Sequence, residues 1–268
     1  MQWFKFCCVI TAFLLIAGCG PKTTPAHDNE ILVLCGGSMR APLEACVKRY
    51  ALRATNVTIL TSYGGSGELC AQIQQSGRGD IFICHDPFMP WAAKQGLISQ
   101  WGTLAYLDVA IIVPKDNPEN ITTLADLARP GLRIGIGDQT YSTSGQIVKY
   151  MLKKFPYGQG ILSNVHMESK GHQERCNYVV EGVLDASIVW APVAHQFRDS
   201  LTILPIPPDY IDSITSATYQ ESDLRNVQVA AGIIAPAKDR PAVQDFYSFL
   251  VSDTRDIFEN YGFRVTTE

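Results

Sequence analysis

Residues 61–73, TSYGGSGELCAQI, set the fold class of this 268-residue chain. A β-rich run at residues 57–61 leads into three glycines, and Leu69 and Ile73 then recur at the spacing of a helix. The segment therefore predicts a strand, a tight turn of small residues and the start of a helix. The bare backbone of the turn either serves only a sharp change of direction or offers its amide groups to a ligand.

Two similar units flank this one. Residues 31–35, ILVLC, and residues 80–84, DIFIC, are apolar runs typical of strands buried on both faces. The first run is broken by small residues and followed by helical spacing, and the second precedes a short helix at residues 91–96. The order strand, helix, strand, helix, strand predicts a parallel sheet with right-handed crossovers.

The second half of the chain continues the alternation. An apolar run at residues 107–113 precedes a capped helix near Thr122 or Thr123. Thr143 and Gln146 have the spacing of a capping box at the start of another helix. Further strands are predicted at residues 133–137, 186–190, 201–206 and 227–234, and further helices at residues 176–181, 241–250 and 254–261.

The units change character at about residues 107–113 and again at about residues 201–210. We therefore predict an α/β fold of two lobes, each a mainly parallel sheet flanked by helices. Residues 30–108 and 206–268 would form the first lobe, and residues 109–205 the second. A chain that crosses twice between two lobes makes a hinge, and a ligand cleft is expected between the lobes.

Composition excludes several classes of protein. Hydrophobic residues make up 46% of the chain and charged residues 18%, which suits a sizeable core and argues against global disorder. The net charge is −4, and no basic patch interleaved with aromatic residues indicates a nucleic-acid partner. If such a chain binds a small anion, it must do so with local donors rather than with a global positive field.

Residues 1–18 are expected to be a signal peptide. Lys5 precedes an apolar run that is shorter than the about 20 residues of a membrane-spanning helix. The run ends in Ile-Ala-Gly before Cys19, which resembles a bacterial lipobox, so we expect Cys19 to carry a diacylglyceryl group. Residues 19–29 would then tether the protein to the outer face of a membrane, in the periplasm or cell envelope. Ordinary secretion with cleavage after Gly18, or an uncleaved anchor, stays open.

Five of the eight cysteines lie beyond Cys19, and none has C-x-x-C spacing. A zinc or redox motif is therefore not indicated. Their apolar or helical context favours buried thiols, although export to an oxidising compartment leaves a disulfide open. The five are Cys35, Cys46, Cys70, Cys84 and Cys176.

Three predicted strands end in a small-residue turn with a serine that leads into a helix. The serines are Ser38, Ser66 and Ser144. The start of a helix leaves about four N–H groups without intrahelical partners and carries roughly half a positive charge. Several such ends directed at one point would make a pocket for a small anion. Each serine could instead be only an N-cap, worth about 1 kcal/mol.

The sequence gives less indication of a catalytic or metal-binding site than of an anion-binding site. The sequence has no G-x-S-x-G elbow, no Walker A motif and no H-E-x-x-H motif. His85-Asp86 follows a strand, and a lipoprotein enzyme using these residues is the alternative from another functional class. A metal site from His85, His172 and His195 would require all three to converge, and their spacing does not indicate this. No resident cofactor or metal is implied.

Taken together, the motifs resemble the molybdate-binding proteins of bacterial ABC importers, within the two-lobed solute-binding superfamily. The resemblance covers roughly residues 31–265. It is carried by GGSMRAPLEACVKRY at residues 36–50, GGSGELCAQIQQSGRGDIFICHD at 64–86, RIGIGDQTYSTSGQIVKYML at 133–152, ASIVW at 186–190 and IFENYGFR at 257–264. It implies a type II periplasmic-binding-protein fold and a non-enzymatic role.

The resemblance also implies the ligand shell. The two serines that hold the oxyanion in that family fall on Ser38 and Ser66, and helix-start amides fall on Ser144 and near Gln173. A tyrosine of the family falls on Trp190, whose indole offers one donor of different reach. We therefore expect capture of a tetrahedral oxyanion, molybdate or tungstate, by a monomer that docks on an ABC permease and ATPase.

Arg40 suggests an alternative ligand for a binding protein. It lies two residues past Ser38. Turned inward, its guanidinium would hold a phosphate-like anion or a carboxylate, and turned outward it would be a solvated surface residue.

Overall fold

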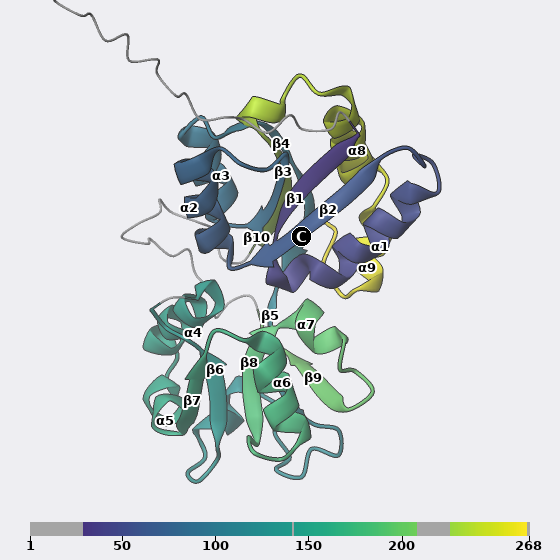
Figure 1. Cartoon of the computed structure of the whole chain (residues 1–268). Coiled ribbons are helices and arrows are strands. Elements are labelled where there is room, and N and C mark those ends of the chain that lie inside the picture. The colour runs from purple at the N-terminus through teal and green to yellow at the C-terminus, as the bar shows by residue number, and fades with distance from the viewer. Residues whose placement is uncertain (1–28, 141, 208–225, 267–268) are drawn as a thin grey trace, which may run out of the picture.

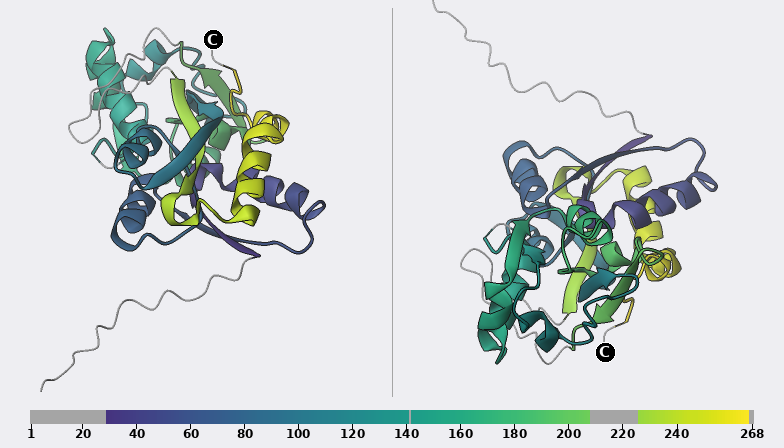
Figure 2. Two further views of the ribbon diagram at one scale, coloured as in Figure 1. Left: turned by 90° about the horizontal axis from the view of Figure 1, so that it is seen from above. Right: turned by 90° about the horizontal axis from the view of Figure 1, so that it is seen from below.

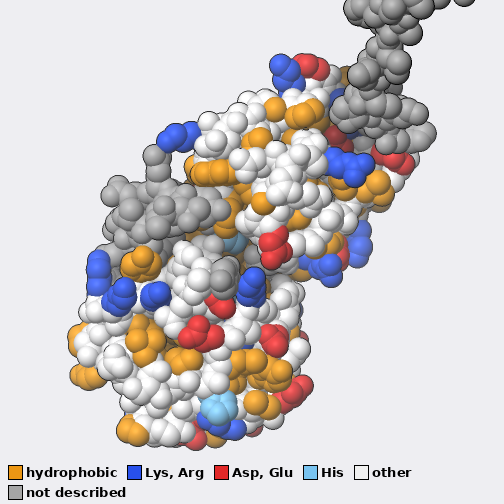
Figure 3. Space-filling view, turned by 60° about the vertical axis from the view of Figure 1, so that its left-hand side comes forward, with side chains coloured by type: hydrophobic (Ala, Val, Ile, Leu, Met, Phe, Trp, Pro, Cys, Tyr) orange, Lys and Arg blue, Asp and Glu red, His pale blue; other side chains and the backbone are white. Residues whose placement is uncertain are grey.

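The computed structural model describes residues 29–140, 142–207 and 226–266. They form two lobes, one above the other in Figure 1, each built on a five-stranded sheet with helices around it. Figure 3 shows the same two lobes in a space-filling view. The predicted two-lobed α/β fold is confirmed.

The first lobe has the strand order β2-β1-β3-β10-β4. Its strands are β1 (Glu30–Gly36), β2 (Thr58–Gly64), β3 (Ile81–His85), β4 (Ile98–Leu107) and β10 (Val227–Ile234). Its helices are α1 (Arg40–Ala51), α2 (Ser66–Ser76), α3 (Phe88–Lys94), α8 (Pro241–Ser252) and α9 (Arg255–Asn260), with the 3-10 turns η1 (Gly37–Met39) and η5 (Ala235–Ala237).

The second lobe has the order β7-β6-β8-β5-β9. Its strands are β5 (Val109–Pro114), β6 (Ile134–Gly137), β7 (Val165–Ser169), β8 (Ala186–Trp190) and β9 (Leu201–Pro205). Its helices are α4 (Thr143–Lys154), α5 (Gly158–Ser163), α6 (His172–Val180) and α7 (Ala191–His195), with the 3-10 turn η2 (Leu124–Ala128).

One strand in each sheet runs against the others. β10 is antiparallel to β3 and β4, and β5 is antiparallel to β8 and β9, while the remaining neighbours are parallel. The reversal follows from the connection between lobes. β4 passes into β5 through the single residue Asp108, so β5 starts at the boundary between the lobes and must run away from it. The strands β1–β3 and β6–β8 end at that boundary instead.

Helices cover both faces of the first sheet, which explains the continuous apolar runs (Figure 2). Leu43 and Tyr50 of α1 are buried against one face, and Leu69 and Ile73 of α2 against the other. All five residues of β3 are buried, as are all five of β8.

The C-terminal segment braces the connection between the lobes. The Arg264 guanidinium pairs with the Asp108 carboxylate at 3.0 Å, and the backbone of Arg264 pairs with Tyr106 of β4. The residue between β4 and β5 is therefore tied to the end of the chain.

Two strands, β4 and β7, leave no clear signal in the sequence. β4 has an irregular burial pattern and two register shifts against β10, so no clean alternation marks it. β7 is an edge strand with no fully buried residue. Without β7, the start of α6 was also misplaced, since the helix begins at His172 and not near Cys176.

The five cysteines beyond Cys19 are buried and free. The open question of a disulfide is thereby answered for the described residues. Cys19 itself lies outside the residues that the structure describes.

Candidate functional site

A cavity of about 710 Å³ lies between the lobes, where six strands end. Because the parallel strands of both sheets point their carboxyl ends at this boundary, the turns and helix starts that follow them meet there. The walls comprise Gly37 and Ser38 after β1, residues 64–68 at the end of β2, His85, Pro87 and Phe88 at the end of β3, Thr140, Ser142, Thr143, Ser144 and Gln146 after β6, residues 170–173 after β7, and Trp190 at the end of β8.

Ser66 is the first residue of α2, and its side chain is only 6% exposed. Its Oγ is buried and has no hydrogen-bond partner. The N-cap of α2 is Gly65, so the hydroxyl does not serve as a cap. A Cβ on Gly36 would lie 2.7 Å from this Oγ, which explains why β1 ends in glycine. An unpartnered buried hydroxyl costs stability unless something binds it.

Ser38 lies in the turn η1 ahead of α1 and is partly buried. The N-cap of α1 is Met39, without a side-chain cap bond. The interpretation of Ser38 and Ser66 as simple helix caps is therefore wrong. Both line the cavity instead.

Ser144 enters the cavity from the second lobe and is 1% exposed. The cap of α4 is Ser142, whose Oγ accepts from the Gly145 amide at 3.0 Å, so the predicted capping box of Thr143 and Gln146 is wrong. A Cβ on Gly137 would lie 2.8 Å from the Oγ atoms of both serines. Glycine at the end of β6 therefore lets the serines approach the strand.

The start of α6 supplies Gln173 and His172. Gln173 is exposed and lines the cavity. His172 Nε2 lies 3.4 Å from Ser144 Oγ, and His172 Nδ1 lies 3.3 Å from the backbone nitrogen of Trp190. The sequence suggests His172 only as a candidate metal ligand, because β7 carries no clear strand pattern and the start of α6 at His172 is therefore not predicted.

Trp190 is 2% exposed, and its indole ring contacts two imidazoles. It stacks on His172 with centroids 5.8 Å apart and an interplanar angle of 24°. Its centroid is also 5.8 Å from that of His85 in the other lobe. Aromatic rings thus form one wall of the cavity.

The surroundings of the two histidines disfavour the charged imidazolium form. Burial lowers the pKa of His85, against the opposing effect of its Nδ1 contact with the Asp86 carbonyl oxygen at 2.7 Å. Burial, with Arg175 and His85 nearby, lowers the pKa of His172 well below its ordinary value. Ionised residues of the lining lie at its rim, where Lys170 and Glu68 pair across the lobes at 3.9 Å, both exposed.

Arg40 does not turn into the cavity. It is exposed, and its guanidinium carbon lies 4.2 Å from the ring centroid of Tyr63. Of the two orientations that the sequence leaves open for Arg40, the structure shows the outward one, and the inward, ligand-holding orientation is corrected. The cation–π contact with Tyr63 gives the side chain a partner on the surface of the first lobe.

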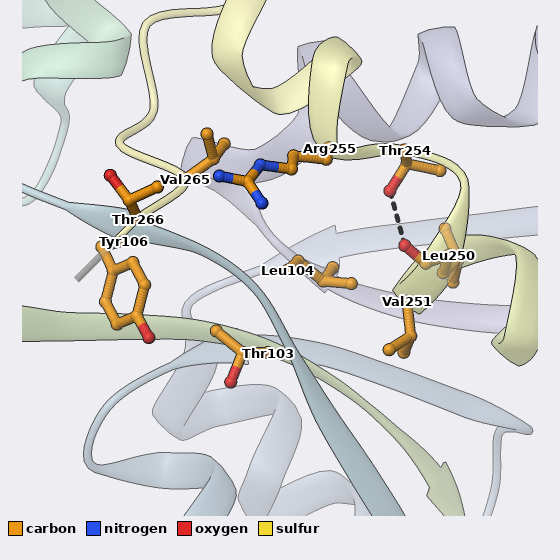
Figure 4. Close-up of a pocket in the computed structure, with 9 residues that line it drawn as sticks. All are labelled: Thr103, Leu104, Tyr106, Leu250, Val251, Thr254, Arg255, Val265 and Thr266. Carbon is orange, nitrogen blue, oxygen red and sulfur yellow. Dashed lines mark hydrogen bonds between the residues drawn. The ribbon is translucent and has the colours of Figure 1, made fainter.

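A second cavity, of about 430 Å³, lies beside β4 between α8 and the C-terminal segment (Figure 4). The Oγ of Thr254 donates to the carbonyl oxygen of Leu250 at 2.5 Å in its wall. Arg255 is the one charged residue among its described lining. The grouped serines and helix starts belong to the cavity between the lobes.

Within residues 29–140, 142–207 and 226–266, no group of three or more His, Cys, Asp or Glu side chains is arranged to hold a metal ion. His85 and His172 share the cavity wall, whereas His195 packs against Gly262. The same residues contain no helix with the length and apolar character needed to cross a bilayer.

Comparisons with known proteins show which proteins this chain is similar to. The Bacillus subtilis protein YvgL, which its name assigns to the substrate-binding lipoproteins of ABC transporters, is 26% identical over 265 residues, 96% of each chain. The molybdate-binding protein ModA of Mycobacterium tuberculosis is 25% identical over 219 residues, 77% of this chain and 82% of that one. The periplasmic molybdate-binding protein of Azotobacter vinelandii superposes with a TM-score of 0.71 at 16% identity, covering 88% of this chain and 100% of that one.

The model of the bacterial extracellular solute-binding protein family matches residues 31–264. That span includes every described helix and every strand except the first residue of β1. The chain therefore belongs to the bacterial extracellular solute-binding proteins.

Proposed function

We propose that this protein is the extracytoplasmic binding component of an ABC importer and that it captures a tetrahedral oxyanion, foremost molybdate or tungstate. The observation that carries the proposal is the buried Ser66 hydroxyl, which has no partner and lines a cavity where the starts of α2, α4 and α6 meet. Ser38, Ser144 and the backbone near Gln173 would complete the shell, and Trp190 would close one side.

Neutral donors suit this ligand. A pocket of fixed N–H and O–H groups prefers a fully ionised anion, because a proton on the ligand would face a donor and lose a hydrogen bond. Closure of the lobes would also exclude water, and the donors become stronger in the drier site. Tungstate fits wherever molybdate fits, since the two dianions match in size and charge.

In transport, the two lobes would close on the ligand and the lipid would anchor the protein. Residues 30–108 with 206–268 would close against residues 109–205 about the connection at Asp108. A lipid on Cys19 would hold the monomer at the membrane, where the closed form would dock on the permease and its ATPase. The similarity to a lipoprotein, YvgL, and to molybdate-binding ModA proteins supports this arrangement.

The alternatives have less support. A phosphate-like or carboxylate ligand held by Arg40 requires that side chain to leave Tyr63 and enter the cavity. An enzyme using His85 as a base would depend on Nε2, because Nδ1 already donates to the Asp86 carbonyl oxygen.

A thermal-shift panel on the chain lacking residues 1–19 tests the proposal. Molybdate, tungstate, sulfate, phosphate and simple carboxylates are compared, and a ligand at 100 times its Kd adds about 2.7 kcal/mol of stability. Molybdate and tungstate should raise the Tm, Ser66→Ala should reduce that rise to about half, and Arg40→Ala should keep it. If no oxyanion raises the Tm, the proposal is wrong.

A further inference from the structure

A fully buried arginine lies behind the candidate site. Arg175, in α6, is 0% exposed and forms no ion pair within the described residues. Its Nη1 donates to the carbonyl oxygen of Ser169 and, at 3.2 Å, to Ser169 Oγ, while its Nε has no partner. Burial lowers the pKa of Arg175 to about 10, so the group is still charged at neutral pH. A buried charge that forms no ion pair lowers the stability of a folded protein, so its presence here suggests a functional role.

The remaining contact of the guanidinium leads to the cavity. Arg175 Nη2 lies 3.2 Å from His172 Nδ1, and the Trp190 amide donates to the same nitrogen at 3.3 Å. Both partners are obligate donors, so Nδ1 must accept and the proton of the neutral imidazole must sit on Nε2. His172 Nε2 faces Ser144 Oγ at 3.4 Å.

We propose that Arg175 is a positioning residue of the ligand site that selects doubly charged anions: its buried guanidinium fixes His172 as an Nε2–H donor beside Ser144, and its positive charge, which forms no ion pair among the described residues, favours a dianion in the cavity. The inference rests on the proposed oxyanion-binding function and deepens it. His172 Nε2–H meets Ser144 Oγ as a donor, which leaves the Ser144 proton to turn toward the ligand. A bound dianion would add negative charge on the cavity side of Arg175.

Tungstate and perrhenate test the charge directly, because they are tetrahedral oxyanions of nearly the same size that differ by one unit of charge. At the effective dielectric of a partly buried site, one unit of charge three hydrogen bonds away from the anion changes its affinity by about tenfold. General damage to the site would weaken the binding of both anions to the same extent. Loss of a positive charge weakens the binding of the dianion tungstate more than that of the monoanion perrhenate. The ratio of the two dissociation constants therefore isolates the contribution of the Arg175 charge.

Three variants of the full chain separate charge from hydrogen bonding. Arg175→Gln keeps a donor for His172 Nδ1 and removes the charge, so the preference for tungstate over perrhenate should shrink about tenfold. Arg175→Lys keeps the charge and should keep most of the preference. Arg133→Gln is the matched control, since it removes a charge from the same lobe at an exposed pair with Asp185 and should leave the ratio unchanged.

Nitrogen-15 NMR of the wild-type imidazoles supplies a test that needs no variant to fold. His172 should show the Nε2–H tautomer at pH 7, and an Nδ1–H tautomer or an imidazolium overturns the inference. An unchanged anion ratio in Arg175→Gln, with tungstate bound by the wild type, overturns the role of Arg175 and leaves the proposed function standing. Failure of the wild type to bind tungstate overturns the proposed function itself, and this inference with it.

Discussion

The imidazole of His85, at the end of β3, lies 5.8 Å from the indole of Trp190, at the end of β8, measured between ring centroids. The two residues belong to different lobes. The rings are tilted by 58°, so they pack without stacking flat. The contact therefore joins the two lobes at the wall of the cavity.

Substitution of Trp190 should separate its contribution to packing from its hydrogen bond to the ligand. Trp190→Ala removes a ring that is 2% exposed and should cost about 3–5 kcal/mol of unfolding free energy. Trp190→Tyr introduces a phenol donor and should retain molybdate binding. Urea unfolding and calorimetric titration check the two results, and equal affinities of wild type and Trp190→Ala would exclude Trp190 from the ligand shell.

Ser66→Ala should uncouple stability from binding. The wild-type hydroxyl is buried and has no hydrogen-bond partner in the protein, so its removal should leave the unfolding free energy unchanged or raise it by up to about 1 kcal/mol. The same change removes a hydrogen-bond donor to the ligand and should lower the affinity for molybdate by about tenfold. Denaturant unfolding of the ligand-free protein and titration with molybdate measure the two effects. A substantial loss of stability would show that Ser66 has a structural partner after all.

Gly137→Ala should damage the second-lobe half of the cavity. The new Cβ would lie 2.7 Å from the Gly145 backbone nitrogen and 2.8 Å from the Oγ atoms of Ser142 and Ser144. We expect a loss of about 1–3 kcal/mol and of most oxyanion affinity, measured by unfolding and titration. Gly37→Ala is the control for stability, because its Cβ would have only an ordinary contact, 3.9 Å, with the Gly64 carbonyl oxygen.

Stability of the ligand-free protein should fall as the pH falls below about 6.5. The pKa values of His85 and His172 are lowered in the fold, chiefly by burial, so the unfolded chain takes up protons that the folded chain refuses. Their contribution is therefore complete above the unfolded pKa and is lost on acidification, by up to about 1.4 kcal/mol per pH unit for each group.

Unfolding in urea between pH 5 and pH 8 measures this slope. Asp185 and Asp256, whose pKa values are lowered by Arg133 and Arg49, contribute only at more acidic pH. The variant His85→Gln/His172→Gln should flatten the slope. An equally steep slope in that variant would assign it to other groups.

The buried cysteines should resist thiol reagents in the folded protein. Burial raises the pKa of Cys70 to about 11 and those of Cys46 and Cys176 to about 12, so few thiolates form at pH 8. In protein lacking residues 1–19, none of the five thiols should react with Ellman's reagent until denaturant is added. All five should then react, since they are free.

Most of the fold could be predicted because its signals are local. The strands β1, β3 and β8 are buried on both faces and form uninterrupted apolar runs, while the glycine-serine turns mark the helix starts that follow strands. The irregular strand β4 and the edge strand β7 bury too few residues to leave such a mark. Their absence from the prediction concealed the start of α6.

By itself, the sequence determined the two-lobed α/β class and placed Ser38, Ser66 and Ser144 at turns after strands, because apolar periodicity and bare glycines depend only on neighbours along the chain. Only the tertiary structure decided which side chains face the cavity. Arg40 and Arg175 each lie near the start of a helix, yet Arg40 stacks on Tyr63 at the surface and Arg175 is buried behind His172. The physical reason is that the direction of a side chain depends on the space and partners that other segments leave for it, and those segments are distant in sequence.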